Sequence, residues 1–230
     1  MDRSTKSAAT LCRSITLGGM QIVLASTSPA RLAVLRGAGI EPVVRPSSVD
    51  EDATLATAGD LSPAETVLTL ARAKALAVAD SADCPDGVVL GGDSMFELDG
   101  QIYGKPGTPE AARERWHLQR GRTGTLWSGH WLADRRSGHT GAAGVGAVKS
   151  AQVTFVDDLA DDEIEAYIAS GEPLQVAGAF TIDSLGGAFI EHIDGDPSTV
   201  IGISLPTLRQ LSGELGIRWH EFWNRPGAAS

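Results

Sequence analysis

The sequence predicts an α/β protein built around a mixed β-sheet. Short apolar runs of strand length alternate with segments that begin like capped helices, and strand hairpins interrupt this alternation. Strands that alternate with helices favour parallel pairing, whereas hairpins add antiparallel strands to the same sheet. At 230 residues, the chain is long enough to bury a sizeable core, either as one large domain or as two small lobes.

Helix and strand signals in the N-terminal half follow one another closely. Ser28 and Pro29 suit the cap and first position of a helix, and Ser62 with Glu65 forms a capping-box pattern. In chain order, we expect a strand at 21–25, a helix from Pro29 to Gly37 or Gly39, a strand-like stretch at 42–45, an acidic loop up to Asp60, and a helix from Ser62 with Val67, Leu68, Ala71, Ala75 and Val78 on its apolar face.

The central stretch, residues 88–106, organises the chain. An apolar run reads as a buried strand that the glycines Gly91 and Gly92 end, so that Asp93 stands at the strand end, where open α/β sheets bind ligands. The dipeptide Asp99-Gly100 favours a type I′ hairpin, whose far arm would return Lys105 to the level of Asp93. One carboxylate and one ammonium suit metal-assisted phosphate chemistry. The alternative is an ordinary hairpin flanked by two surface charges.

Three further segments carry candidate binding residues. A hydroxyl-rich turn containing Ser26 leads into the first helix, and Arg31 lies in its first turn; the segment is either an anion site or a routine capped helix with a solvated arginine. The acidic run at 50–52 is either a solvated loop or a source of Mg²⁺ ligands. Lys74 lies beside an apolar helix stripe, from which it could reach solvent or a cleft.

The C-terminal half continues the mixed pattern. In chain order, we expect a helix from Thr108 to near Gly121, a strand at 125–134, a mobile hairpin tip at 135–146, a strand at 148–156, a helix from Asp161 to Gly171, strands at 180–183 and 188–193, a turn at 194–198, a helix at 206–215, and a terminal aromatic patch of Trp219, Phe222 and Trp223.

Composition excludes several classes of protein. The formal net charge of −10 argues against binding a nucleic-acid polymer, although it permits a local phosphate pocket. No apolar run is long enough for a membrane span, and two cysteines without a pairing or metal pattern fit a reducing cytoplasm. The five histidines lack zinc-ligand spacing, and no serine-hydrolase, Walker or dinucleotide motif is present.

A series of collinear motifs resembles the Maf family of nucleoside triphosphate pyrophosphatases across residues 20–216. The matching blocks are Leu24-Ala25-Ser26-Thr27-Ser28-Pro29-Ala30-Arg31, Val49-Asp50-Glu51, Leu70-Ala71-Arg72-Ala73-Lys74-Ala75, Gly92-Asp93-Ser94, Leu98-Asp99-Gly100-Gln101-Ile102-Tyr103-Gly104-Lys105-Pro106, Ser170-Gly171-Glu172-Pro173-Leu174, Gly178-Ala179-Phe180, Ile193-Asp194-Gly195-Asp196, and Val200-Ile201-Gly202-Ile203-Ser204-Leu205-Pro206. Each block alone is weak, but their shared order makes the resemblance specific.

The resemblance implies a two-lobed fold with a long mixed sheet and a cleft between the lobes, like that of the inosine-triphosphate pyrophosphatases. It implies one catalytic domain at 20–225, with a tail at 226–230, and hydrolysis of a nucleoside triphosphate to monophosphate and pyrophosphate. Residues 1–19, which precede Met20 and lack a long apolar core, are either a flexible extension or a wrongly assigned start. By position, Asp93 would be the proton acceptor. Ser26, Arg31, Lys74 and Lys105 would bind the triphosphate, and Glu51 with Asp93 would bind Mg²⁺ or Mn²⁺. A homodimer is expected on the same basis.

Three positions depart from the family pattern where the family sets its base preference. Ala30 stands where a second arginine is frequent, Ser94 where threonine is common, and Asp183 where pyrimidine-type members carry glutamine. The chain therefore matches neither the dTTP/UTP type nor the 7-methyl-GTP type, and Asp183 would suit a donor edge such as that of guanine. The alternatives to a house-cleaning pyrophosphatase are a non-catalytic nucleotide-responsive regulator of septum formation and, less favoured, a nucleotidyltransferase.

Overall fold

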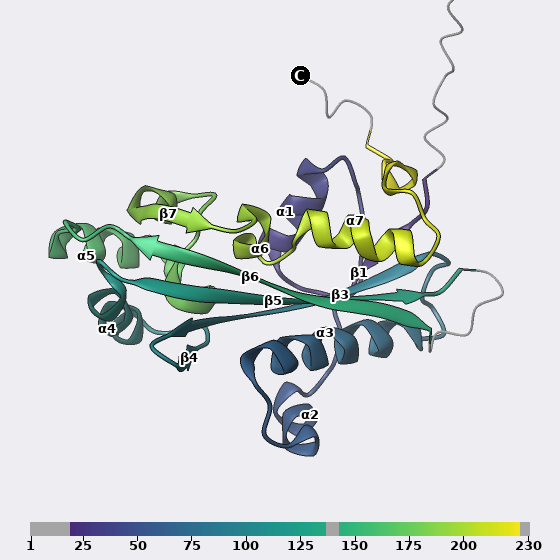
Figure 1. The fold of residues 1–230 in the computed structure, drawn as a ribbon, viewed down its shortest axis with the longest axis horizontal. Coiled ribbons are helices and arrows are strands. Elements are labelled where there is room, and N and C mark those ends of the chain that lie inside the picture. Colours follow the sequence, from purple (N-terminus) through teal and green to yellow (C-terminus); the bar gives the residue numbers. More distant parts are fainter. Residues whose placement is uncertain (1–18, 137–142, 226–230) are drawn as a thin grey trace, which may run out of the picture.

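A seven-stranded mixed sheet forms the centre of the molecule (Figure 1). A computed structural model describes residues 19–136 and 143–225. The strand order is β2-β1-β3-β5-β6-β7, and β4 pairs with β3. The strands β2, β1 and β3 run parallel, whereas β3 pairs with β4 and β5, β5 with β6, and β6 with β7 in antiparallel fashion. The strands are β1 (Ile22–Leu24), β2 (Val43–Val44), β3 (Val88–Leu98), β4 (Gln101–Tyr103), β5 (Thr123–Asp134), β6 (Gly144–Phe155) and β7 (Ile190–Asp194). The mixed α/β prediction is confirmed.

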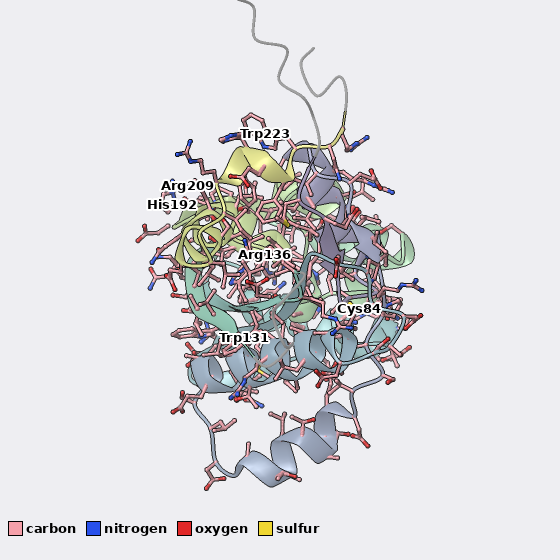
Figure 2. The ribbon with its side chains drawn as sticks, turned by 90° about the vertical axis from the view of Figure 1, so that its right-hand side faces the viewer. Cys84, Trp131, Arg136, His192, Arg209 and Trp223 are labelled. Carbon is pink, nitrogen blue, oxygen red and sulfur yellow. The ribbon has the colours of Figure 1, made fainter. Side chains whose placement is uncertain are left out.

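Helices cover both faces of the sheet. Figure 2, viewed along the long axis of the molecule, shows α3 on one side of the sheet and α7 on the other. The α-helices are α1 (Pro29–Gly37), α2 (Glu51–Ala58), α3 (Pro63–Ala79), α4 (Pro109–Gln119), α5 (Asp161–Ala169), α6 (Pro197–Ile201) and α7 (Leu205–Glu214). The predicted start signals are confirmed: Ser28 Oγ accepts from the N–H of Arg31, and Ser62 with Glu65 forms the capping box.

Alternation along β1 explains the two faces. Ile22 and Leu24 pack with α7 residues, whereas Val23 packs against the α3 side with Ala75. The same alternation in β3 turns odd-numbered residues towards α3, because successive strand side chains point to opposite faces. Asp93 and Ser94 therefore point to opposite sides of the sheet.

Separate hydrophobic cores lie at the two ends of the long strands. Residues of β3 up to Leu90 belong to clusters with β1, α3 and α7, whereas Phe96 and Leu98 belong to a cluster with α4, α5 and β6. An edge-to-face aromatic group fills the second cluster, with Trp116 against Phe155 at a centroid distance of 5.5 Å. This separation of the core is consistent with the expected two lobes. Residues 91–95 of β3 lie between the two groups of core residues.

The prediction that Gly91 and Gly92 end the central strand was wrong. Strand β3 runs through both glycines for 11 residues. A Cβ on Gly91 would lie 2.0 Å from the carbonyl oxygen of Ala71 in α3, and one on Gly129 of β5 would lie 2.2 Å from that of Val67. These glycines allow α3 to pack directly on the sheet backbone, and Asp93 consequently lies within a strand instead of at its end. The turn prediction is confirmed: β3 and β4 pair as a hairpin, with positive φ at Asp99 and Gly100.

The acidic segment after β2 is not a loop throughout. It contains the helix α2, whose N-cap Asp50 accepts a hydrogen bond from the N–H of Ala53 at 2.9 Å. Glu51 and Asp52 occupy the first turn, where the helix dipole favours negative charge. The helix fixes the position of Glu51.

The strand predicted at 180–183 is also absent. This segment has no regular structure and lies between the 3₁₀ helices Ala177–Ala179 and Leu185–Phe189; β7 begins only at Ile190. The carboxylate of Glu172 holds it, accepting bonds from the Tyr167 hydroxyl, the Thr181 hydroxyl and the Gly186 N–H. Burial alone would raise the pKa of Glu172, but these hydrogen bonds lower it to about 2, so the carboxylate is ionised at neutral pH.

The remaining predicted elements agree with the structure within a few residues at their ends. The aromatic patch divides: Phe222 is buried and meets Trp219 edge to face, whereas Trp223 is 40% exposed. The turn expected at 194–198 connects the end of β7 at Asp194 to α6, which begins at Pro197 with Asp196 as its N-cap. Residues 1–18, 137–142 and 226–230 lie outside the described residues, and with them Cys12, most of the expected N-terminal extension and the middle of the hairpin tip predicted at 135–146. The end of that predicted tip belongs to a strand instead, because β6 already begins at Gly144 and pairs with β5 from there. Among the described helices, none combines the length and apolarity that a membrane crossing needs.

Candidate active site

The candidate site lies at an open stretch of the β3 edge. On this edge β1 pairs with Val88–Leu90 and ends, while β4 pairs only with Phe96–Leu98. Within the described residues, no strand pairs with 91–95 on this side. The stretch follows the carboxyl end of β1, where ligands bind in open α/β sheets, and the turn from β1 to α1 begins there.

A carboxylate–lysine cluster, composed of Glu51, Lys74 and Asp93, lies on the α3 face. Lys74 Nζ is 2.7 Å from Asp93 Oδ1 and 2.8 Å from Glu51 Oε1. The side chains of Lys74 and Asp93 are each only 11% exposed, whereas that of Glu51 is 51% exposed. Three elements contribute one residue each: α2, α3 and β3. The predicted alternative of a solvated Lys74 is therefore excluded.

An arginine–hydroxyl cluster, centred on Arg31, lies on the opposite face. The Nε of Arg31 donates to the Gly202 carbonyl, Nη1 to Ser26 Oγ and Nη2 to Ser94 Oγ, at 3.1, 3.2 and 3.1 Å. These acceptors are neutral, and Arg31 forms no ion pair within the described part of the chain. The guanidinium is thus a fixed positive charge instead of a solvated side chain.

A hydroxyl chain extends this cluster into the sheet. Ser94 Oγ is 2.9 Å from Ser128 Oγ, and the Ser128 hydroxyl donates to the Thr199 carbonyl at 2.9 Å. Each hydroxyl has one proton, so Ser94 accepts from Arg31 and donates to Ser128. Ser94 therefore orients Arg31.

Burial governs the titration of the central groups. Desolvation raises the pKa of Asp93 above its ordinary value, although Lys74 and Arg31 favour the ionised form. Desolvation lowers the pKa of Arg31, which Asp93 and Glu51 oppose electrostatically. A carboxylate with a raised pKa beside cations is a common arrangement for a proton acceptor.

Sequence reasoning missed His130, a fully buried residue behind the arginine–hydroxyl cluster. Its Nε2 accepts the backbone N–H of Ser204 at 2.8 Å, and burial, with the nearby charge of Arg31, lowers its pKa to about 4. The imidazole is therefore neutral at neutral pH and fixes the segment that supplies the Gly202 carbonyl. Neither His130 nor Ser128 belongs to a local sequence motif. The register between β3 and β5, which places them opposite Gly92 and Ser94, is the signal that would have identified them.

Three predicted site residues are not joined to these clusters. Lys105 follows β4, is exposed, and forms no hydrogen bond or ion pair with the described residues. Asp183 is likewise exposed, beside the 3₁₀ helix Leu185–Phe189. Ala30 lies in the first turn of α1, next to Arg31.

Glu51 and Asp93 are the predicted ligands of a divalent cation. Within 19–136 and 143–225, no group of three or more His, Cys, Asp and Glu side chains is arranged to hold a metal. Glu51 and Asp93, however, each direct an oxygen at the single cation Lys74 Nζ. Two carboxylates fit Mg²⁺ or Mn²⁺ where substrate phosphates and water supply further ligands. A pocket of about 320 Å³ lies elsewhere, between the segment after β2 and the end of α3, and none of the candidate residues lines it.

The fold and the site together define a class of protein. A buried carboxylate, an ammonium and a guanidinium at the carboxyl end of parallel strands are typical of α/β proteins that bind phosphorylated ligands. The family model described as Maf-like protein matches residues 21–215, and the chain belongs to this family.

The sequence similarity to several named proteins covers nearly the whole chain. A protein of Leifsonia xyli subsp. xyli named nucleoside triphosphate pyrophosphatase is 61% identical over 216 residues, which are 91% of this chain and 100% of that protein. Proteins with the same name from Corynebacterium efficiens and Saccharopolyspora erythraea are each 51% identical; the matches cover 90% and 91% of this chain and 100% of each relative.

Proposed function

We propose that the protein hydrolyses a nucleoside triphosphate to the monophosphate and pyrophosphate. The observation that carries this proposal is the buried Asp93 in contact with Lys74, in a Maf-family chain whose similar relatives are named nucleoside triphosphate pyrophosphatases. Asp93, Lys74 and Arg31 supply the proton acceptor and the fixed cations that such a displacement requires. The unit that acts is the single domain at 20–225.

The reaction is a displacement by water at the α-phosphorus. The water oxygen forms a bond to this phosphorus, the bond from the α-phosphorus to the bridging oxygen breaks, and pyrophosphate leaves with the bond electrons. Asp93 accepts the proton of the attacking water. Ser26, Arg31, Lys74 and Lys105 bind the triphosphate oxygens, where they offset negative charge. The role of Lys105 requires that its segment approach the open β3 edge when substrate binds.

Glu51 and Asp93 would hold a divalent cation, Mg²⁺ or Mn²⁺, together with the substrate phosphates. The cation would supply charge neutralisation and help to orient the triphosphate. The exposed carboxylate of Glu51 and the buried one of Asp93 lie close enough to share one cation, as their joint contact with Lys74 indicates.

The biological setting follows from the substrate class. Removal of non-canonical or surplus nucleotides in the cytoplasm is the role we propose, and the free thiol of Cys84 agrees with a reducing compartment. A homodimer is part of the same proposal. The net charge of −10 favours a small nucleotide over a nucleic-acid polymer.

The direct test is a panel of canonical and modified nucleoside triphosphates with Mg²⁺ or Mn²⁺. We expect monophosphate and pyrophosphate in equal amounts, and in ¹⁸O-labelled water the label should enter the monophosphate. Label in pyrophosphate would contradict attack at the α-phosphorus. Turnover that requires a second substrate would indicate a nucleotidyltransferase, and binding without turnover would indicate the regulator of septum formation.

The base preference is expected to depend on Asp183. Its exposed carboxylate can accept hydrogen bonds from the N1–H and exocyclic amine of a guanine, and the Glu172 network holds the neighbouring backbone. Replacing Asp183 with Asn should lower the kcat/KM for guanine-type substrates by about tenfold or more relative to other bases, since a hydrogen bond to a charged group contributes about 1.5–3 kcal/mol. Asp158→Asn, at another exposed position in the same lobe, is the control. An unchanged preference in Asp183→Asn would refute the assignment, and Ala30 would then be the next position to vary.

A further inference from the structure

Lys74 has two anionic partners and hardly any contact with solvent. Its Nζ lies within hydrogen-bond distance of both Asp93 and Glu51, at 2.7 and 2.8 Å. The lysine stands within α3, whose backbone packs directly on β3 at Gly91, so its starting point is fixed relative to Asp93. The ammonium is therefore held between the two carboxylates by the fold itself.

The same two carboxylates form the donor set proposed for the divalent cation. A divalent cation and an ammonium repel one another, and this repulsion is strong where burial limits screening by water. The cation can use Asp93 and Glu51 together only if Lys74 gives up at least one of these contacts. The two cations are therefore competitors for one pair of oxygens.

No other described cation contacts this pair. Arg31 lies on the opposite face of β3, and its Nε, Nη1 and Nη2 already donate to Gly202, Ser26 and Ser94. Within the described residues, Lys74 alone forms ion pairs with Asp93 and Glu51. Its removal would leave two neighbouring carboxylates without a contacting positive charge, which raises their attraction for any cation in solution.

We propose that Lys74 is an internal counter-cation that excludes free divalent cations from Glu51 and Asp93 until the triphosphate binds. The triphosphate offers Lys74 a new anionic partner, so the lysine turns to the phosphates and the two carboxylates become available. Metal and nucleotide then bind together, and the empty protein does not retain metal. This inference rests on the proposed function, because it gives Lys74 two successive partners within the same site.

The test measures Mn²⁺ binding to the substrate-free protein from the electron paramagnetic resonance signal of free Mn²⁺. Lys74→Met removes the charge and keeps an apolar side chain of similar length. We expect Mn²⁺ to bind this variant at least about tenfold more tightly than the wild type, because the competing charge is gone. Lys149→Met, at an exposed position of β6, should bind Mn²⁺ like the wild type.

A second pair of variants tests the same role if the Lys74→Met protein does not fold. Should the two carboxylates prevent Lys74→Met from folding, Asp93→Asn is compared with Lys74→Met/Asp93→Asn, in which one carboxylate is already neutral. The double variant should bind Mn²⁺ more tightly than the single one. Equal or weaker binding on removal of Lys74 would overturn the role.

The result separates this inference from the proposed function. A wild type that releases pyrophosphate but binds free Mn²⁺ as tightly as Lys74→Met overturns only the counter-cation role. Absence of turnover with every nucleotide overturns the proposed function, while the Mn²⁺ comparison still reports on Lys74.

Discussion

Replacing Asp93 with Asn is expected to lower kcat for pyrophosphate release by about a thousandfold. Asparagine preserves the size of the side chain but cannot accept the proton of the attacking water, and general-base catalysis contributes about 10²–10⁴-fold. The substitution also removes one of the two anionic partners of Lys74. The measurement is steady-state pyrophosphate release at saturating nucleotide.

The control variant is Asp60→Asn, an exposed position just before α3, which should retain wild-type kcat. The thermal midpoint and circular dichroism of Asp93→Asn must show that the protein is folded. Wild-type turnover in a folded Asp93→Asn protein would move the chemistry to another residue, and Glu51 would be the next carboxylate to replace.

Local signals in the sequence identified helix starts and the hairpin turn correctly. Ser28 with Pro29, and the capping box at Ser62, depend on contacts within one turn of helix, so the relevant physics is present in a few adjacent residues. The dipeptide Asp99-Gly100 likewise specifies a turn through its own backbone preferences. These elements needed no knowledge of the rest of the fold.

The wrong predictions arise where distant segments decide local structure. The segment at 180–183 has strand-like composition, yet the carboxylate of Glu172 binds Thr181 and the backbone at Gly186 instead of leaving the segment to a sheet. The acidic run is a different case, because the N-cap of α2 at Asp50 is a local signal that the loop prediction overlooks, and only the contact of Glu51 with Lys74 joins distant segments. In the folded chain, Asp50 caps α2 and Glu51 reaches Lys74.

The sequence predicts which residues form the candidate site, but it does not predict that they form two separate clusters. Family resemblance named Asp93, Lys74, Glu51, Arg31 and Ser26, and the structure brings the first three together on one face and the last two together on the other. The division follows from strand alternation at Asp93 and Ser94, which depends on β3 continuing through its glycines. Sequence reasoning ended the strand there, so it could not separate the faces.

Replacing Gly91 with Ala is expected to destabilise the protein by about 3 kcal/mol, the upper end of the usual cost of overpacking, which lowers the thermal midpoint by about 6–12 °C. The added Cβ would lie 2.0 Å from the Ala71 carbonyl oxygen and 2.8 Å from the Ala75 backbone nitrogen. Both are backbone atoms of α3, so no side-chain rotation relieves the clash and the helix itself must move. Thermal and urea unfolding measure the loss.

Gly213→Ala is the matched control, because a Cβ there meets nothing within 4 Å and the residue lies in the helix α7. This variant should be as stable as the wild type or more stable by up to about 1 kcal/mol. A Gly91→Ala protein with a wild-type midpoint would show that α3 can withdraw from the sheet at little cost.

Since Lys74 is carried by α3 and Asp93 by β3, their 2.7 Å contact depends on the same close approach. Any Gly91→Ala protein that remains folded should therefore also lose pyrophosphate release. Gly91 thus supports the chemistry at Asp93, two residues further along β3, and does not end the strand.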